Sequence, residues 1–152
     1  MRRVRDATHA DVPALVEGIG ELLAELGGLA PPADQLADAA HALIENPDAG
    51  AVLVAESDGQ LVGVLGVSWQ SAIRIPGSYG LIQELWIRPG WRGNALGGEL
   101  LAALYRLAGE RGIGRIEVGL PSERFAGLAK TEAFYRANDF EVIGTRLRRQ
   151  LS

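Results

Sequence analysis

Three β-rich runs follow one another between residues 51 and 87, and no helical segment separates them. The first two flank Asp58-Gly59, a dipeptide that favours a two-residue hairpin turn. The third run, "YGLIQELWI", starts after a turn predicted at "IPGS" (residues 75–78) and ends at Pro89-Gly90. Because consecutive strands with short connections pair antiparallel, the sequence predicts a three-stranded meander at the centre of the fold.

Two helical segments precede this meander, after a short first strand predicted at residues 2–7. The first helix is predicted to begin near Asp11 and to end at Gly27-Gly28. The second is predicted to end before Pro47. The apolar residues that define the first helix recur at helical spacing: Val12, Leu15, Val16, Ile19, Leu22, Leu23 and Leu26.

Helices and strands alternate in the second half of the chain. A helix from Leu96 to Gly112, a strand over residues 115–120, a helix over 129–139 and closing β structure over 140–151 are predicted. We expect an α/β (α+β) fold with helices on both faces of a mixed sheet. A chain of 152 residues fits one domain of ordinary size, so residues 1–152 are predicted to form a single domain.

Composition excludes several classes of protein. The chain has no cysteine and two well-separated histidines, so we expect no disulfide and no metal site. A net charge of −4 argues against nucleic-acid binding and is compatible with a cationic substrate. No apolar stretch reaches the roughly 18 residues of a membrane span, and the N-terminus lacks a signal-peptide pattern. A cytoplasmic protein without a membrane partner is expected.

The segment "RPGWRGNALGGELLAAL" (residues 88–104) has four glycines around the start of a predicted helix. A strand, a glycine-containing loop and a helix N-terminus together suit phosphate binding, because the first helical N–H groups are unpaired and glycine lets an anion approach. A tight turn without a ligand is the alternative. The segment matches neither the P-loop nor the GxGxxG dinucleotide pattern.

The stretch "ELWIRPGWRGNALGGELL" resembles the acetyl-coenzyme A motif of the GNAT superfamily of N-acetyltransferases, Arg/Gln-x-x-Gly-x-Gly/Ala. Arg92 and Gly97 match its ends, whereas Ala95 replaces its middle glycine. The element order of the whole chain is similar to that of the family. The resemblance implies a single-domain fold with a mixed, mostly antiparallel sheet of six or seven strands and about four helices.

A second stretch, "EAFYRANDF" (residues 132–140), resembles the late helix of the family, which carries a tyrosine followed by a Gly-Phe pair. Tyr135 matches the tyrosine, and Asp139 replaces the glycine. The family often has a cofactor-binding asparagine seven residues before this tyrosine. Leu128 stands there, so that contact is not carried over.

The resemblance implies that this chain binds acetyl-CoA as a cosubstrate. Its pantetheine arm would lie along one strand, and backbone amides of the glycine segment would hold the pyrophosphate. Ala95 is expected to fit there in right-handed helical backbone. The implied contacts are Leu85, Trp86 and Ile87 on the strand, and Arg92, Gly93, Asn94, Ala95, Leu96, Gly97 and Gly98 in the loop and helix.

Glu84 interrupts the otherwise apolar run "LIQELWI" and, on strand alternation, points to the same face as Trp86. Acetyl transfer to an amine needs a base, and a carboxylate beside the cofactor strand could remove the proton or anchor the amine. A salt bridge between Glu84 and a neighbour such as Arg115 is the structural alternative. A backbone N–H near Ile87 could stabilise the oxyanion.

Tyr135 is the candidate general acid, because the family places its acid on this helix and a phenol with pKa near 10 suits protonation of a thiolate. A tyrosine packed under the sheet is the alternative. The candidate catalytic residues are therefore Glu84 and Tyr135. Glu21 and Glu25 are interpreted as solvated charges, and the basic "TRLRRQLS" as a solvated edge strand.

These observations favour an acetyl-CoA-dependent N-acetyltransferase that acts on a primary amine of a small molecule or peptide. A non-catalytic acyl-CoA-binding or regulatory module is one alternative. A phosphate-binding interaction domain unrelated to coenzyme A is another. An exposed last strand could also pair two copies of the chain into a homodimer.

Overall fold

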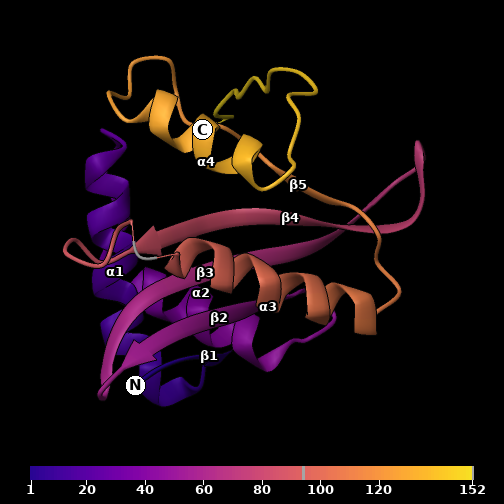
Figure 1. Ribbon diagram of the computed structural model, residues 1–152. Helices are drawn as coiled ribbons and strands as arrows, with labels where there is room; N and C mark the ends of the chain where they lie inside the picture. The colour runs from indigo at the N-terminus through magenta and orange to yellow at the C-terminus, as the bar shows by residue number, and fades with distance from the viewer. Residues whose placement is uncertain (94, 152) are drawn as a thin grey trace. The chain divides into compact units, whose positions relative to one another are not determined.

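A five-stranded sheet is the framework of the unit formed by Met1–Val118 (Figure 1). The computed structural model describes residues 1–93 and 95–151. The strands lie in chain order, and all neighbours are antiparallel except β4 and β5, which are parallel. They are β1 (Arg2–Asp6), β2 (Gly50–Ser57), β3 (Gln60–Ala72), β4 (Ile75–Ile87) and β5 (Ile116–Val118). The sheet is mixed as predicted, but it has five strands among the described residues instead of six or seven.

Helices cover both faces of this sheet, as the sequence predicts. Helices α1 (Val12–Glu25) and α2 (Ala33–Glu45) lie on one face, and α3 (Leu96–Glu110) lies on the other (Figure 1). A short 3-10 turn, η1 (His9–Asp11), leads into α1. Among the described residues, no helix is both long and apolar enough to cross a bilayer.

Helix α1 comes unusually close to β4 at Gly18. A Cβ atom at Gly18 would lie 2.7 Å from Cε3 of Trp86, which is closer than real Cβ contacts allow. Trp86 is 1% exposed and belongs to the same apolar cluster as Val12, Leu15 and Val16 of α1. The missing side chain at Gly18 thus lets α1 rest directly on the strand that carries Glu84.

The two hairpins of the meander differ in how well the sequence predicts them. Asp58 and Gly59 both have positive φ, 50° and 80°, which fits the predicted two-residue turn between β2 and β3. The turn predicted at residues 75–78 is wrong, because β4 already begins at Ile75 and Ala72 lies opposite Ile75. The β3–β4 turn therefore falls at Ile73 and Arg74.

The second unit runs from Gly119 to the C-terminus and contains helix α4 (Leu128–Ala137). After this helix, Asp139 has a positive φ of 69°, the conformation that favours glycine at a helix end. The predicted closing β structure over residues 140–151 is wrong, since no described residue there belongs to a strand. A strand requires a paired neighbour, which alternation of side chains alone does not guarantee.

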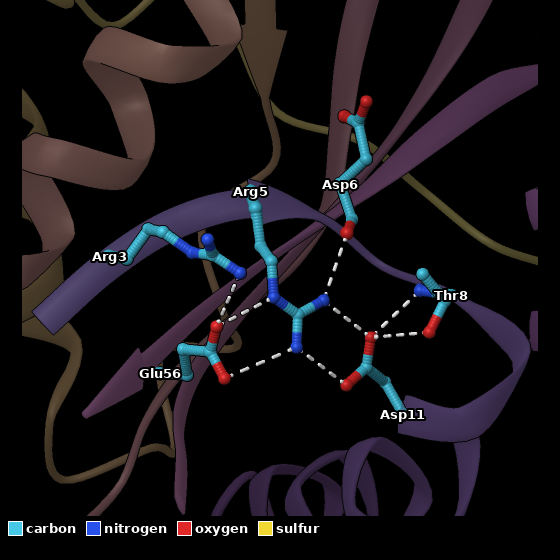
Figure 2. Close-up of polar contacts among 6 residues, drawn as sticks. All are labelled: Arg3, Arg5, Asp6, Thr8, Asp11 and Glu56. Carbon is cyan, nitrogen blue, oxygen red and sulfur yellow. Dashed lines mark hydrogen bonds and ion pairs between the residues drawn. The ribbon is translucent and has the colours of Figure 1, made fainter. Parts of the chain in front are cut away.

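A polar network fixes β1 to the start of α1 (Figure 2). Arg5 donates from Nη1 to Oδ2 of Asp11 at 2.7 Å and from Nη2 to Oδ1 at 2.9 Å, while its Nε donates to Oε1 of Glu56 at 2.9 Å. The Thr8 N–H also donates to Oδ2 of Asp11, at 2.7 Å. These hydrogen bonds, led by those from Arg5, lower the pKa of Asp11 from 3.8 to about 2.

Asp11→Asn is expected to lower the free energy of unfolding at neutral pH by about 1–2 kcal/mol, because a bidentate charged pair becomes a neutral contact. The pKa of Asp11 is lower in the folded state, so its stabilisation is present above the unfolded-state pKa. It is lost as the pH falls from about 4 toward 2. Urea unfolding of both proteins across this range measures the difference.

Asp58→Asn is the control, because Asp58 pairs with the N-terminal ammonium at 2.8 Å but its side chain is 86% exposed. Such an exposed pair contributes little to stability, and no measurable change is expected. An Asp11→Asn effect that persists unchanged at low pH would contradict the assignment.

Candidate active site

A β-bulge in β4 lies next to Glu84. Gly66 of β3 is opposite Glu84, but the next residue, Val67, is opposite Ile82, so Gln83 is an extra residue in β4. A bulge of this kind bends a strand and changes where its side chains point. No register shift separates Glu84 from Trp86, so both side chains lie on the α1 face of the sheet, as predicted from alternation.

The end of β4 has an unpaired edge. Strand β5 pairs only with Gly80, Leu81 and Ile82 of β4, and no strand of the described chain pairs with the outer edge of residues 83–87. On the inner side, the Arg88 N–H donates to the Val62 carbonyl at 2.8 Å. Because hydrogen-bonded positions alternate in an antiparallel pair, Leu85 and Ile87 direct their N–H and C=O groups to the unpaired edge.

Glu84 is partly buried and has no hydrogen-bond or ion-pair partner among the described residues. Burial disfavours the charged form, so it raises the pKa of Glu84 above its ordinary value of 4.5. The alternative of a salt bridge to Arg115 is wrong, because Arg115 pairs with Glu117 at 2.7 Å. The carboxylate therefore has no partner among the described residues, and it lies over Gly66 of β3.

The loop between β4 and α3 uses left-handed backbone where the sequence places small residues. Gly90, Gly93 and Ala95 have φ values of 93°, 83° and 63°. The expectation of right-handed backbone at Ala95 is wrong: its φ of 63° and ψ of 7° are left-handed, and it caps α3. A residue with a Cβ atom is strained there relative to glycine by roughly 1 kcal/mol. Asn94, also predicted to contact the cofactor, lies outside the described residues.

Helix α3 begins directly after this loop, at Leu96. Its first backbone N–H groups have no partner within the helix. Gly97 and Gly98 occupy this first turn, where they add no side chain between those groups and solvent. The N-terminus of α3 is thus chemically suited to an anion.

The Arg92 side chain links three parts of the first unit. Its Nε donates to the Ile87 carbonyl at 2.9 Å, and its Nη2 donates to Oε1 of Glu25 in α1 at 2.7 Å. Glu21 and Glu25 are exposed, as the interpretation of solvated charges predicts, but Glu25 also has an ion-pair partner that the sequence does not predict. This contact could not be found in the sequence, because Glu25 and Arg92 are 67 positions apart.

Trp86 and Tyr135 are both buried. The Trp86 side chain packs against α1 and is 1% exposed, and its indole Nε1 has no acceptor among the described residues. By the alternation described above, the backbone N–H and C=O of Trp86 point to β3 and not to the unpaired edge. Tyr135 belongs to the second unit, is 6% exposed, and meets Phe134 and Phe140 edge-on at ring separations of 5.1 and 5.2 Å.

The structure brings Glu84, the Leu85–Ile87 edge, Arg92 and the start of α3 together in the first unit. Sequence reasoning missed Gly66 opposite Glu84 and Gln83 in the bulge. A glycine inside a β-rich run is a known sign of a close approach, so Gly66 carried a readable signal. No group of three or more potential metal ligands occurs within the described part of the chain.

Comparison with known families identifies the chain. The model of the acetyltransferase (GNAT) family matches residues 20–140, which include β4, α3 and the glycine loop. The chain belongs to this family. It is accordingly an acyltransferase of the GNAT fold, with acetyl-CoA as the cosubstrate that the family uses. No curated protein matches this acetyltransferase significantly.

Solved structures share the fold of this acetyltransferase over its full length. A possible acetyltransferase from Clostridium difficile 630 has a TM-score of 0.83 at 14% identity, covering 100% of this chain and 98% of that one. Glucosamine-6-phosphate N-acetyltransferase from Arabidopsis thaliana has a TM-score of 0.78 at 14% identity, covering 100% and 99%. A predicted acetyltransferase from Clostridium acetobutylicum, solved with acetyl-CoA, has a TM-score of 0.78 at 21% identity, covering 99% and 97%.

Proposed function

We propose that this protein transfers an acetyl group from acetyl-CoA to a primary amine of a small molecule or peptide, by direct attack of the amine on the thioester. The observation that carries this proposal is the Glu84 carboxylate, which is partly buried, lacks an ion-pair partner among the described residues and is carried by the part of β4 whose outer edge is unpaired. A carboxylate with a raised pKa suits a base that works near neutral pH.

The residues present fit acetyl-CoA. Leu85 offers its N–H and C=O at the unpaired edge of β4, and Ile87 offers its N–H, since the Ile87 carbonyl already accepts from Arg92. These groups support placing the amide-containing pantetheine arm there as an added strand-like partner. The first turn of α3, with Gly97 and Gly98, supports placing the pyrophosphate at the helix N-terminus. The Arg92 side chain is already bonded to Ile87 and Glu25, so its proposed contact to phosphate is through its backbone amide.

In the proposed reaction, Glu84, a backbone N–H group and Tyr135 each have one role. Glu84 takes one proton from the ammonium form of the acceptor, and the freed nitrogen lone pair attacks the thioester carbonyl carbon. The carbonyl π electrons move to oxygen, and a backbone N–H near Ile87 stabilises this oxyanion. When the C=O bond reforms, the C–S bond breaks and the coenzyme A thiolate accepts a proton from Tyr135. The attacking nitrogen gives up its second proton, which restores the Tyr135 phenol through solvent. The products are the acetylated amine and coenzyme A.

An amine acceptor is supported by charge and by a relative. The chain carries a net charge of −4, and a cationic amine would be attracted to Glu84. The similar Arabidopsis protein is named for acetylation of glucosamine-6-phosphate, an amino sugar. We therefore propose testing glucosamine, spermidine and lysine as acceptors, with release of the coenzyme A thiol as the measurement.

Gly97→Asp is expected to weaken acetyl-CoA binding at least about 100-fold, because the new carboxylate lies where the pyrophosphate is proposed to bind. Calorimetry and the thermal shift with acetyl-CoA measure this loss. The matched control is Gly109→Asp, which adds the same charge near the other end of α3, where nothing lies within 4 Å. Binding that survives in the Gly97 variant would contradict the phosphate site.

A further inference from the structure

Gly66 of β3 lies directly across from Glu84 in the antiparallel pair. A Cβ atom at this position would overlap Oε2 of Glu84 and would lie 3.4 Å from its Cδ. Two atoms cannot occupy the same volume, so any larger residue at position 66 would displace the carboxylate. The absence of a side chain at Gly66 is what gives the Glu84 carboxylate its room.

Glycine is otherwise a poor choice at this position. In the interior of a strand it costs conformational entropy and leaves no side chain to pack. The neighbouring glycine of the same strand, Gly63, faces apolar atoms of Leu100 and Ile87 at 3.1 and 3.2 Å. Gly66 differs because the group that fills its space is an ionisable carboxylate.

We propose that Gly66 is a positioning residue for acetyl transfer, because its missing side chain leaves the space over β3 in which the Glu84 carboxylate lies, next to the bulge at Gln83. This inference rests on the proposed role of Glu84 as the base. The same placement keeps the carboxylate partly buried, which is the cause of its raised pKa.

Gly66→Ala is expected to push the carboxylate toward solvent. Titration of the Glu84 carboxyl carbon by ¹³C NMR should then show a midpoint that falls toward that of an exposed glutamate. The kcat with acetyl-CoA and the best of the three amines above should fall by about 10-fold or more, because a base displaced by an ångström loses its alignment. The affinity for acetyl-CoA should stay the same.

The double variant Gly66→Ala/Glu84→Asp tests the contact itself. Aspartate is one methylene shorter than glutamate, so its carboxylate withdraws from the added methyl group. The loss of kcat in the double variant should be at least about 5-fold smaller than the product of the two single losses.

Gly80→Ala is the matched control on β4. Its Cβ would lie 2.8 Å from Cδ1 of Ile116 and 3.0 Å from Cζ3 of Trp69, so it crowds apolar side chains of the same sheet. We expect a loss of stability in this variant but an unchanged titration of Glu84.

The proposal is overturned if Glu84 titrates identically in Gly66→Ala, or if the two single losses multiply. Should Gly66→Ala fail to fold, folding of the double variant supports the proposal, and failure of both overturns it. If Glu84→Gln keeps full activity while the titration still responds to Gly66, then Gly66 positions the carboxylate but the proposed base role fails.

Discussion

Glu84→Gln should lower turnover by about 100-fold or more while leaving the fold intact. The amide keeps the shape of the side chain but cannot accept the proton of the acceptor amine. The affinity for acetyl-CoA should stay within about 1 kcal/mol, because no cofactor contact is assigned to the Glu84 side chain. Steady-state release of the coenzyme A thiol, together with calorimetry, measures both effects.

The pH dependence separates a base from a structural residue. If Glu84 is the base, the rate falls as the pH drops below its folded-state pKa, and this acid limb should change in the glutamine variant. The pKa of Glu84 is raised on folding, so its stabilising contribution is present at low pH and is lost as the pH rises through the folded-state value. At neutral pH, Glu84→Gln should therefore be as stable as the natural protein or more stable.

Loss of activity without loss of stability is the expected signature of Glu84→Gln. If Glu84 only attracted the amine, Glu84→Gln would instead raise the KM for the acceptor and leave the acid limb of the rate profile in place. Natural rates at every pH would leave Glu84 with a structural role alone.

Tyr135→Phe should lower turnover by roughly 10- to 1000-fold and change acetyl-CoA affinity by less than about 1 kcal/mol. The phenol is proposed to act only when the thiolate leaves, so binding of the ground state does not need it. Phenylalanine keeps the edge-on contacts with Phe134 and Phe140, so a rate effect would not come from a cavity. The lower limit is 10-fold because a thiolate leaves without help.

Tyr105→Phe is the control, because it removes the same oxygen from α3, where Tyr105 is 41% exposed. We expect natural turnover in this variant. Equal turnover in the Tyr135 and Tyr105 variants would make Tyr135 a packing residue. Inactivity of the natural protein toward every amine would favour an acyl-CoA-binding module.

Local signals predicted most of the elements. The Asp58-Gly59 turn, the apolar stripe of α1 and the order of the elements through α4 depend on neighbours along the chain, and the structure has them where the sequence placed them. The shared face of Glu84 and Trp86 followed from alternation because the bulge ends at Gln83, before these residues.

Features that depend on distant residues were not predictable from one sequence. The bulge exists only in the register between β3 and β4, and the Arg92–Glu25 pair requires α1 to lie beside the loop. Segment 140–151 is a second example. Its sequence pattern is typical of a strand, but the pattern does not determine which strand of the sheet it would pair with.

The backbone of Ala95 also changes how the acetyl-coenzyme A motif should be interpreted. The motif describes this position by its residue, whereas in this chain the backbone there adopts a left-handed φ of 63°. Asparagine and aspartate reach left-handed backbone more readily than β-branched residues do. A sequence with asparagine or aspartate at the position of Ala95 would adopt the same backbone geometry without matching the residue pattern of the motif. At this position of the chain, the backbone angle therefore decides which substitutions can be accommodated, and a β-branched residue would be strained more than asparagine or aspartate.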